Sequence, residues 1–111
     1  MEEKDWPASF EKELQQAEAA RSAGNEGKAR VCARRAAGIL ARQVLLREGI
    51  QPQGSSALDF LKQLQNLAML DEETRASAAF FLLRVDESKH LPADIDLLAQ
   101  ARWLRGRLFG R

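Results

Sequence analysis

The sequence has one cysteine, one histidine and no tyrosine among its 111 residues. A single cysteine excludes a disulfide framework and a cysteine-rich metal site, and we expect Cys32 to be an inert buried thiol. No apolar run is long enough to span a bilayer, and the N-terminal MEEKDW lacks the pattern of a signal peptide. We therefore expect a cytoplasmic protein that does not enter a membrane. No glycine-rich phosphate loop, zinc spacing or Ser-His-Asp set is present, so no metal and no cofactor are predicted.

Helix-forming residues make up most of what remains, with many Ala, Leu, Arg, Gln and Glu and few Val or Ile. Apolar spacing and capping residues predict an all-α domain over residues 1–111, in which 1–6 form a tail. The predicted helices cover 7–23, 25–49, a short stretch from 57, 72 to about 85, and about 93 or 94 to 109. Four of them would form the main bundle, and the short third helix would bridge across it. Asn25, Ser56 and Asp71 are the expected N-caps.

The same spacing predicts a core. The residues expected to be buried are Phe10, Leu14, Cys32, Ala36, Leu40, Leu61, Leu64, Phe80, Phe81, Leu83, Leu97, Leu104 and Leu108. The run from Phe80 to Leu83 is apolar on all sides, which is typical of the most enclosed element of a domain.

The segment 25–49 is apolar on two sides, and its second stripe consists of Val31, Gly38, Ala41 and Leu45. A second stripe needs a second partner, which either a central position in a bundle or an oligomer interface would supply. Because small residues let helices approach closely, we predict a homodimer through this stripe. Trp103, outside the core face of the last helix, is expected to join that interface.

Charge is distributed unevenly, although the net charge is only +1. Residues 1–20 hold six acids and two lysines, whereas 28–47 hold six bases and no acid. Three of these bases are candidate phosphate ligands: Arg34, Arg35 and Arg42. The alternative, which the sequence favours, is a solvated face or pairing with the acids of the first helix. Those acids are Glu11, Glu13 and Glu18.

Four predicted helical segments follow one another along the chain. They are an Ala- and Arg-rich helix ending in LLREGI, the helix SALDFLKQL, a helix ending in FFLLRV, and a last helix DLLAQARWL. In this order and spacing, residues 13–109 resemble the HEPN family of small prokaryotic helical domains. The resemblance implies an up-and-down helical bundle that commonly dimerises. It also implies nucleotide or RNA chemistry, with members acting as toxin ribonucleases or as partners of small nucleotidyltransferases.

The family's functional signature is an Arg followed four to six residues later by a His, and Arg84 and His90 fit with five residues between them. An Arg can hold the scissile phosphate while a His moves the proton of a ribose 2′-OH, so the resemblance implies a metal-independent ribonuclease. The residue after the Arg is usually polar in the nuclease members of that family, whereas here it is Val85. Asp86 and Glu87 lie between Arg84 and His90 in the sequence and would repel a phosphate. These departures favour an ordinary interhelical loop.

We therefore expect a non-catalytic interaction or binding module of HEPN type. Its expected partner is a second copy, a small nucleotidyltransferase, an antitoxin, a nucleotide or a nucleic acid. The alternative is the toxin-type ribonuclease that uses Arg84 and His90. A simple binder of phosphate backbones fits less well, because that mode of binding depends on accumulated positive charge.

Overall fold

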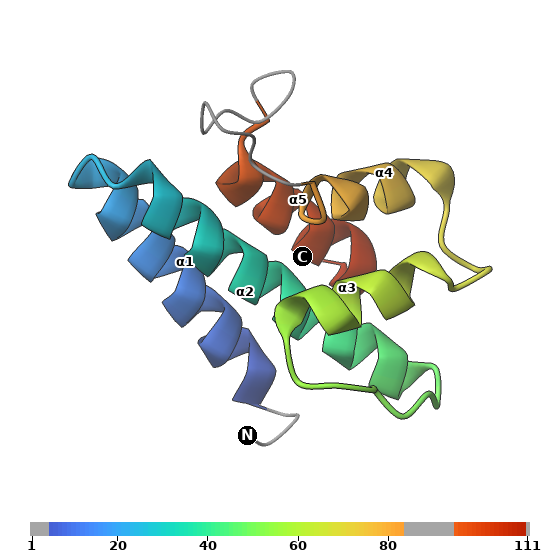
Figure 1. Cartoon of the computed structure of the whole chain (residues 1–111). Helices are drawn as coiled ribbons and strands as arrows, with labels where there is room; N and C mark the ends of the chain where they lie inside the picture. Colours follow the sequence, from blue (N-terminus) through green and yellow to red (C-terminus); the bar gives the residue numbers. More distant parts are fainter. Residues whose placement is uncertain (1–4, 84–94, 111) are drawn as a thin grey trace.

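The computed structural model describes residues 5–83 and 95–110. These ranges contain five helices and no strand, which confirms the all-α class. In chain order the helices are α1 (Trp6–Ser22), α2 (Glu26–Arg47), α3 (Ala57–Gln65), α4 (Glu72–Phe80) and α5 (Leu97–Phe109). Figure 1 shows α1 and α2 side by side as an antiparallel hairpin, with the other three helices on one side of it. None of the helices described is long and apolar enough to cross a membrane.

Local hydrogen bonds determine where α2, α3 and α4 begin, as the sequence predicts. Asn25 and Asp71 each accept a backbone N–H from the first turn of the helix that follows, at 3.1 and 2.8 Å. Ser56 and Asp59 bond reciprocally at the start of α3 and form a capping box. All three predicted N-caps are therefore confirmed.

The second apolar stripe of α2 is explained within the chain, because α2 contacts α1, α3 and α5. Gly38, Ala41 and Leu45 are buried. A Cβ placed on Gly38 would lie only 2.5 Å from the Cβ of Ala57 in α3. Glycine at this position thus allows α3 to pack directly on the backbone of α2. Of the two explanations for the stripe, the central position of α2 accounts for these three residues.

The predicted fourth helix, 72–85, ends earlier in the structure, at Phe80. The N–H of Phe81 bonds to the carbonyl three residues back rather than four, which tightens the last turn. The ring of Phe81 is fully buried, and the Nε of Arg34 donates to its main-chain carbonyl at 2.8 Å. A side chain from α2 therefore satisfies the carbonyl at which the helix ends.

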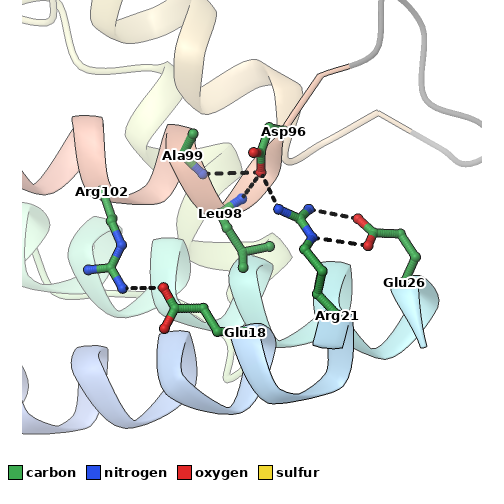
Figure 2. Close-up of polar contacts among 7 residues, drawn as sticks. All are labelled: Glu18, Arg21, Glu26, Asp96, Leu98, Ala99 and Arg102. Carbon is green, nitrogen blue, oxygen red and sulfur yellow. Dashed lines mark hydrogen bonds and ion pairs between the residues drawn. The ribbon is translucent and has the colours of Figure 1, made fainter. Parts of the chain in front are cut away.

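The last helix also begins later than the predicted residue 93 or 94, at Leu97. Asp96 caps it by accepting the N–H groups of Leu98 and Ala99 (Figure 2). The same carboxylate accepts from Arg21 of α1 at 3.1 Å. The start of α5 is therefore tied to the end of α1.

Most of the predicted core is confirmed. Phe80, Leu83 and Leu108 are the exceptions, since each is only partly buried. The predicted tail is shorter than 1–6, because Trp6 is the first residue of α1. Its ring lies 4.5 Å from that of Phe109, between ring centroids, so apolar packing joins the start of α1 to the end of α5.

Candidate functional site

A cavity of about 260 Å³ lies between α1, α2 and α3. Its lining residues are Glu13, Arg35, Gly38, Ile39, Arg42, Gln43, Ser55, Ala57 and Phe60. We refer to it as the Arg35–Arg42 pocket. Its volume lies near the lower end of the range for ligand sites, so it suits a small ligand or one part of a larger one.

Arg35 and Arg42 reach this pocket because they are seven residues apart on α2, about two helical turns, and so project from the same face. Gly38 and Ile39 lie between them on that face and also line the pocket. No hydrogen bond or ion pair joins either guanidinium to any other part of the chain that the structure describes. Among the described residues, both charges are therefore without a partner.

Two acids of α1, Glu11 and Glu18, pair with α5 instead of α2. Arg102 bonds to Glu18 at 2.6 Å, and Arg105 bonds to Glu11 at 2.9 Å. The explanation that these two acids neutralise the arginines of α2 is therefore wrong. The reason is geometric, since α5 presents its arginines to the side of α1 on which both acids lie.

Glu13 differs from its neighbours on α1. It lines the Arg35–Arg42 pocket, and its Oε1 is buried without a hydrogen-bond partner among residues 5–83 and 95–110. A buried acceptor without a donor costs free energy, because it has lost its bonds to water. The residues that line the pocket thus include two arginines and one glutamate, and neither guanidinium nor the Oε1 of Glu13 has a partner among the described residues.

Arg34 does not belong to this pocket, although the sequence groups it with Arg35 and Arg42. Its Nε is engaged by the carbonyl of Phe81. Burial lowers the pKa of the Arg34 guanidinium, and the nearby charge of Arg30 lowers it further. Of the three predicted phosphate ligands, the structure therefore brings together Arg35 and Arg42 and gives Arg34 a structural contact.

The five residues predicted for a dimer interface lie in different environments. Gly38, Ala41 and Leu45 are covered within the chain, so in this conformation they offer no surface to a second copy. Val31 is 43% exposed. Trp103 is partly buried and lines a separate cavity of about 280 Å³ between α4 and α5, where the guanidinium of Arg107 lies 5.4 Å from its ring. The homodimer stays a prediction, with Val31 and Trp103 as its accessible residues.

A third cavity, of about 370 Å³, lies between α1 and α5, but the charges around it already have partners. Arg21 bonds to Asp96 and to Glu26, the latter at 2.7 Å, and Arg102 bonds to Glu18 (Figure 2). These contacts join the first, second and last helices. We interpret this cluster as a structural tie rather than a ligand site.

Arg84 and His90, the predicted catalytic pair, lie outside the described residues. The described part of the chain contains no group of three or more His, Cys, Asp or Glu side chains that could hold a metal ion.

From the sequence, Glu13 is expected only as an ion-pair partner, and Ile39 and Phe60 are not identified as pocket residues. No local pattern identifies them, because the pocket is assembled from three separate helices. In comparisons with protein-family models, curated proteins and solved structures, the chain matches none of them.

Proposed function

We propose that this chain is a non-catalytic binding module that holds the phosphate of a nucleotide at Arg35 and Arg42. The observation that supports this is a pair of guanidiniums on one face of α2, at a concave site, without partners in the part of the chain that the structure describes. The planar guanidinium binds phosphate oxygens through two parallel hydrogen bonds. Neither arginine would have to break an ion pair with a residue in 5–83 or 95–110 to bind one.

The walls of the pocket favour a ligand with an apolar face as well as a charge. Ile39 and Phe60, which are partly buried, supply carbon surface beside the two arginines. Small-molecule sites typically combine such walls with a few polar groups that fix orientation. A nucleotide has both features in its base and its phosphate. A long nucleic acid fits less well, because the chain carries a net charge of only +1.

We also propose that the chain is related to the HEPN family and forms the up-and-down bundle that this relationship implies. A cytoplasmic location is part of the same proposal. The proposal also includes a second copy of the chain, a small nucleotidyltransferase or an antitoxin as protein partner. The support is the order of the segments in the sequence, together with the antiparallel hairpin of α1 and α2.

Isothermal titration calorimetry with ribose 5-phosphate, AMP and GMP tests the proposal. Arg35→Gln and Arg42→Gln should each weaken binding of all three ligands by about tenfold or more, because each removes charged hydrogen bonds to the phosphate. Arg30→Gln is the matched control, since it removes one positive charge from the same helix outside the pocket. Absence of binding, or equal losses in all three variants, would refute the proposal.

A further inference from the structure

We infer that the side-chain amide of Gln43 binds the polar edge of the base when a nucleotide occupies the Arg35–Arg42 pocket, an inference that rests on the proposed function. Gln43 lines this pocket together with the two arginines. It is only 7% exposed, although glutamine is mostly an exposed residue in proteins. A buried amide normally has a hydrogen-bond partner within the chain, because burial removes its bonds to water.

The amide of Gln43 has no such partner among residues 5–83 and 95–110. Ser77, which is also buried, shows the usual arrangement, since its hydroxyl donates to the amide oxygen of Gln100 at 2.6 Å. Unlike the Oε1 of Glu13, the amide atoms of Gln43 are not sealed from solvent. Because Gln43 lines the pocket, the small surface that its amide retains is open to a ligand there.

Gln43 lies beside the groups that the proposed function uses. Arg35, Ile39 and Gln43 follow one another at intervals of four residues, so they share a face of α2. Arg35 is exposed and Arg42 is partly buried, whereas Gln43 is buried. The two charges thus lie nearer to solvent than the amide does. A phosphate, which is costly to remove from water, would stay at the outer end of the pocket while the base lies deeper, against Ile39 and Phe60.

An amide suits the edge of a base because it offers an N–H donor next to a carbonyl acceptor. Adenine presents the complementary pair, an amino group beside a ring nitrogen, and glutamine binds this pair through two hydrogen bonds in complexes with DNA. The other bases also place a donor beside an acceptor. Gln43 therefore distinguishes a nucleotide from a sugar phosphate rather than one base from another, and a base that lacks its amino group should lose part of the contact.

The test is a calorimetric titration of the wild-type chain with AMP, ribose 5-phosphate and purine riboside 5′-monophosphate at one ionic strength. The last ligand keeps the purine ring but lacks the 6-amino group of adenine. AMP should bind about fivefold or more tightly than either of the others, because each lacks at least one hydrogen bond to Gln43. Equal binding of AMP and its purine analogue would overturn the inference, and this comparison requires no variant.

Gln43→Met removes the amide but keeps an unbranched side chain of similar length. It should weaken AMP about fivefold, leave ribose 5-phosphate within about twofold, and abolish the advantage of AMP over its purine analogue. Gln15→Met is the matched control, since Gln15 is exposed on α1 and does not line the pocket. Thermal unfolding checks that both variants are folded. Equal weakening of AMP and ribose 5-phosphate in Gln43→Met, or an advantage of AMP over its analogue that persists there, would overturn the inference.

The two proposals fail differently. Binding of ribose 5-phosphate that weakens in Arg35→Gln and Arg42→Gln, without any advantage for AMP, would overturn the role of Gln43 and leave the phosphate site. AMP binding that neither arginine variant weakens would overturn the phosphate site itself, whatever the effect of Gln43→Met.

Discussion

The Nε of Arg34 donates a hydrogen bond of 2.8 Å to the main-chain carbonyl of Phe81, forty-seven residues away in the sequence. The contact connects α2 to the end of α4. It also explains why two adjacent arginines differ, because Arg34 is committed to the fold while Arg35 faces the pocket.

Arg34→Ala should lower the free energy of unfolding by about 1–2 kcal/mol, because it leaves the Phe81 carbonyl without its donor. Urea denaturation measures the change. Arg35→Ala is the control, and as an exposed residue without a described partner it should change stability by less than about 0.5 kcal/mol. Equal losses in the two variants would show that the carbonyl contact contributes nothing specific.

Phe81→Ala should cost about 3–5 kcal/mol, because the ring is fully buried and its removal leaves a cavity in the core. Met69→Ala is a suitable comparison, since Met69 is 54% exposed. It should change stability by less than about 0.5 kcal/mol. A small loss for Phe81→Ala in thermal or urea unfolding would contradict the position of Phe81 in the core.

Gly38→Ala should destabilise the chain by roughly 1–2 kcal/mol, because the new Cβ would meet Ala57 at 2.5 Å. The loss should not depend on protein concentration, since the contact lies within one chain. Gly27→Ala in the same helix has its nearest neighbour at 3.9 Å and should stabilise slightly.

The concentration dependence separates two explanations of the small-residue stripe. If Gly38 lay at an interface between two copies, its substitution would shift the unfolding midpoint more at high protein concentration and would change the sedimentation coefficient. The packing of α3 predicts neither effect.

The free energy of unfolding should decrease in acid because of the ion pairs of Arg21 with Glu26 and Asp96, which join α1, α2 and α5. Burial alone would raise the pKa of Asp96, but the N–H of Ala99 and the guanidinium of Arg21 together bring it below its ordinary 3.8. The hydrogen bond from Arg21 likewise lowers the pKa of Glu26 below 4.5. Groups with lowered pKa values in the folded state contribute stability above their ordinary values and lose it as the pH falls through the lowered ones. The loss should therefore begin below about pH 5.

Asp96→Asn tests this directly, because asparagine can still cap α5 but does not titrate. The variant should be less stable than the wild type at pH 7 and should lose less stability between pH 7 and about pH 3. Urea midpoints at the two pH values give the comparison. An identical acid loss in both proteins would exclude Asp96 as a contributor.

A binding module should not cleave RNA. We expect the wild-type chain and His90→Ala to leave single-stranded RNA equally intact when incubated with a chelator, because Asp86 and Glu87 oppose phosphate binding between Arg84 and His90. Gel analysis of the RNA measures this. Cleavage by the wild type that drops about 10²–10⁴-fold in His90→Ala would establish the ribonuclease alternative instead.

The helical class and the beginnings of three helices could be predicted from the sequence alone. Asn25, Ser56 and Asp71 each accept a hydrogen bond from the backbone N–H three residues further on, so their effect is local and can be predicted from spacing. The apolar periodicity likewise identified most of the core, Phe81 included, because burial of a helical face follows from its repeat.

The end of α4, the partners of the arginines and the pocket could not be predicted from the sequence, because they depend on tertiary contacts. A carbonyl held by Arg34, a glycine pressed against Ala57, and a carboxylate of α1 beside two arginines of α2 each depend on segments distant in the sequence. The sequence shows which charges exist, but pairing is decided by which helices come together. Arg102 and Arg105 of α5 therefore pair with Glu18 and Glu11 of α1. Arg35 and Arg42 have no partner among the described residues.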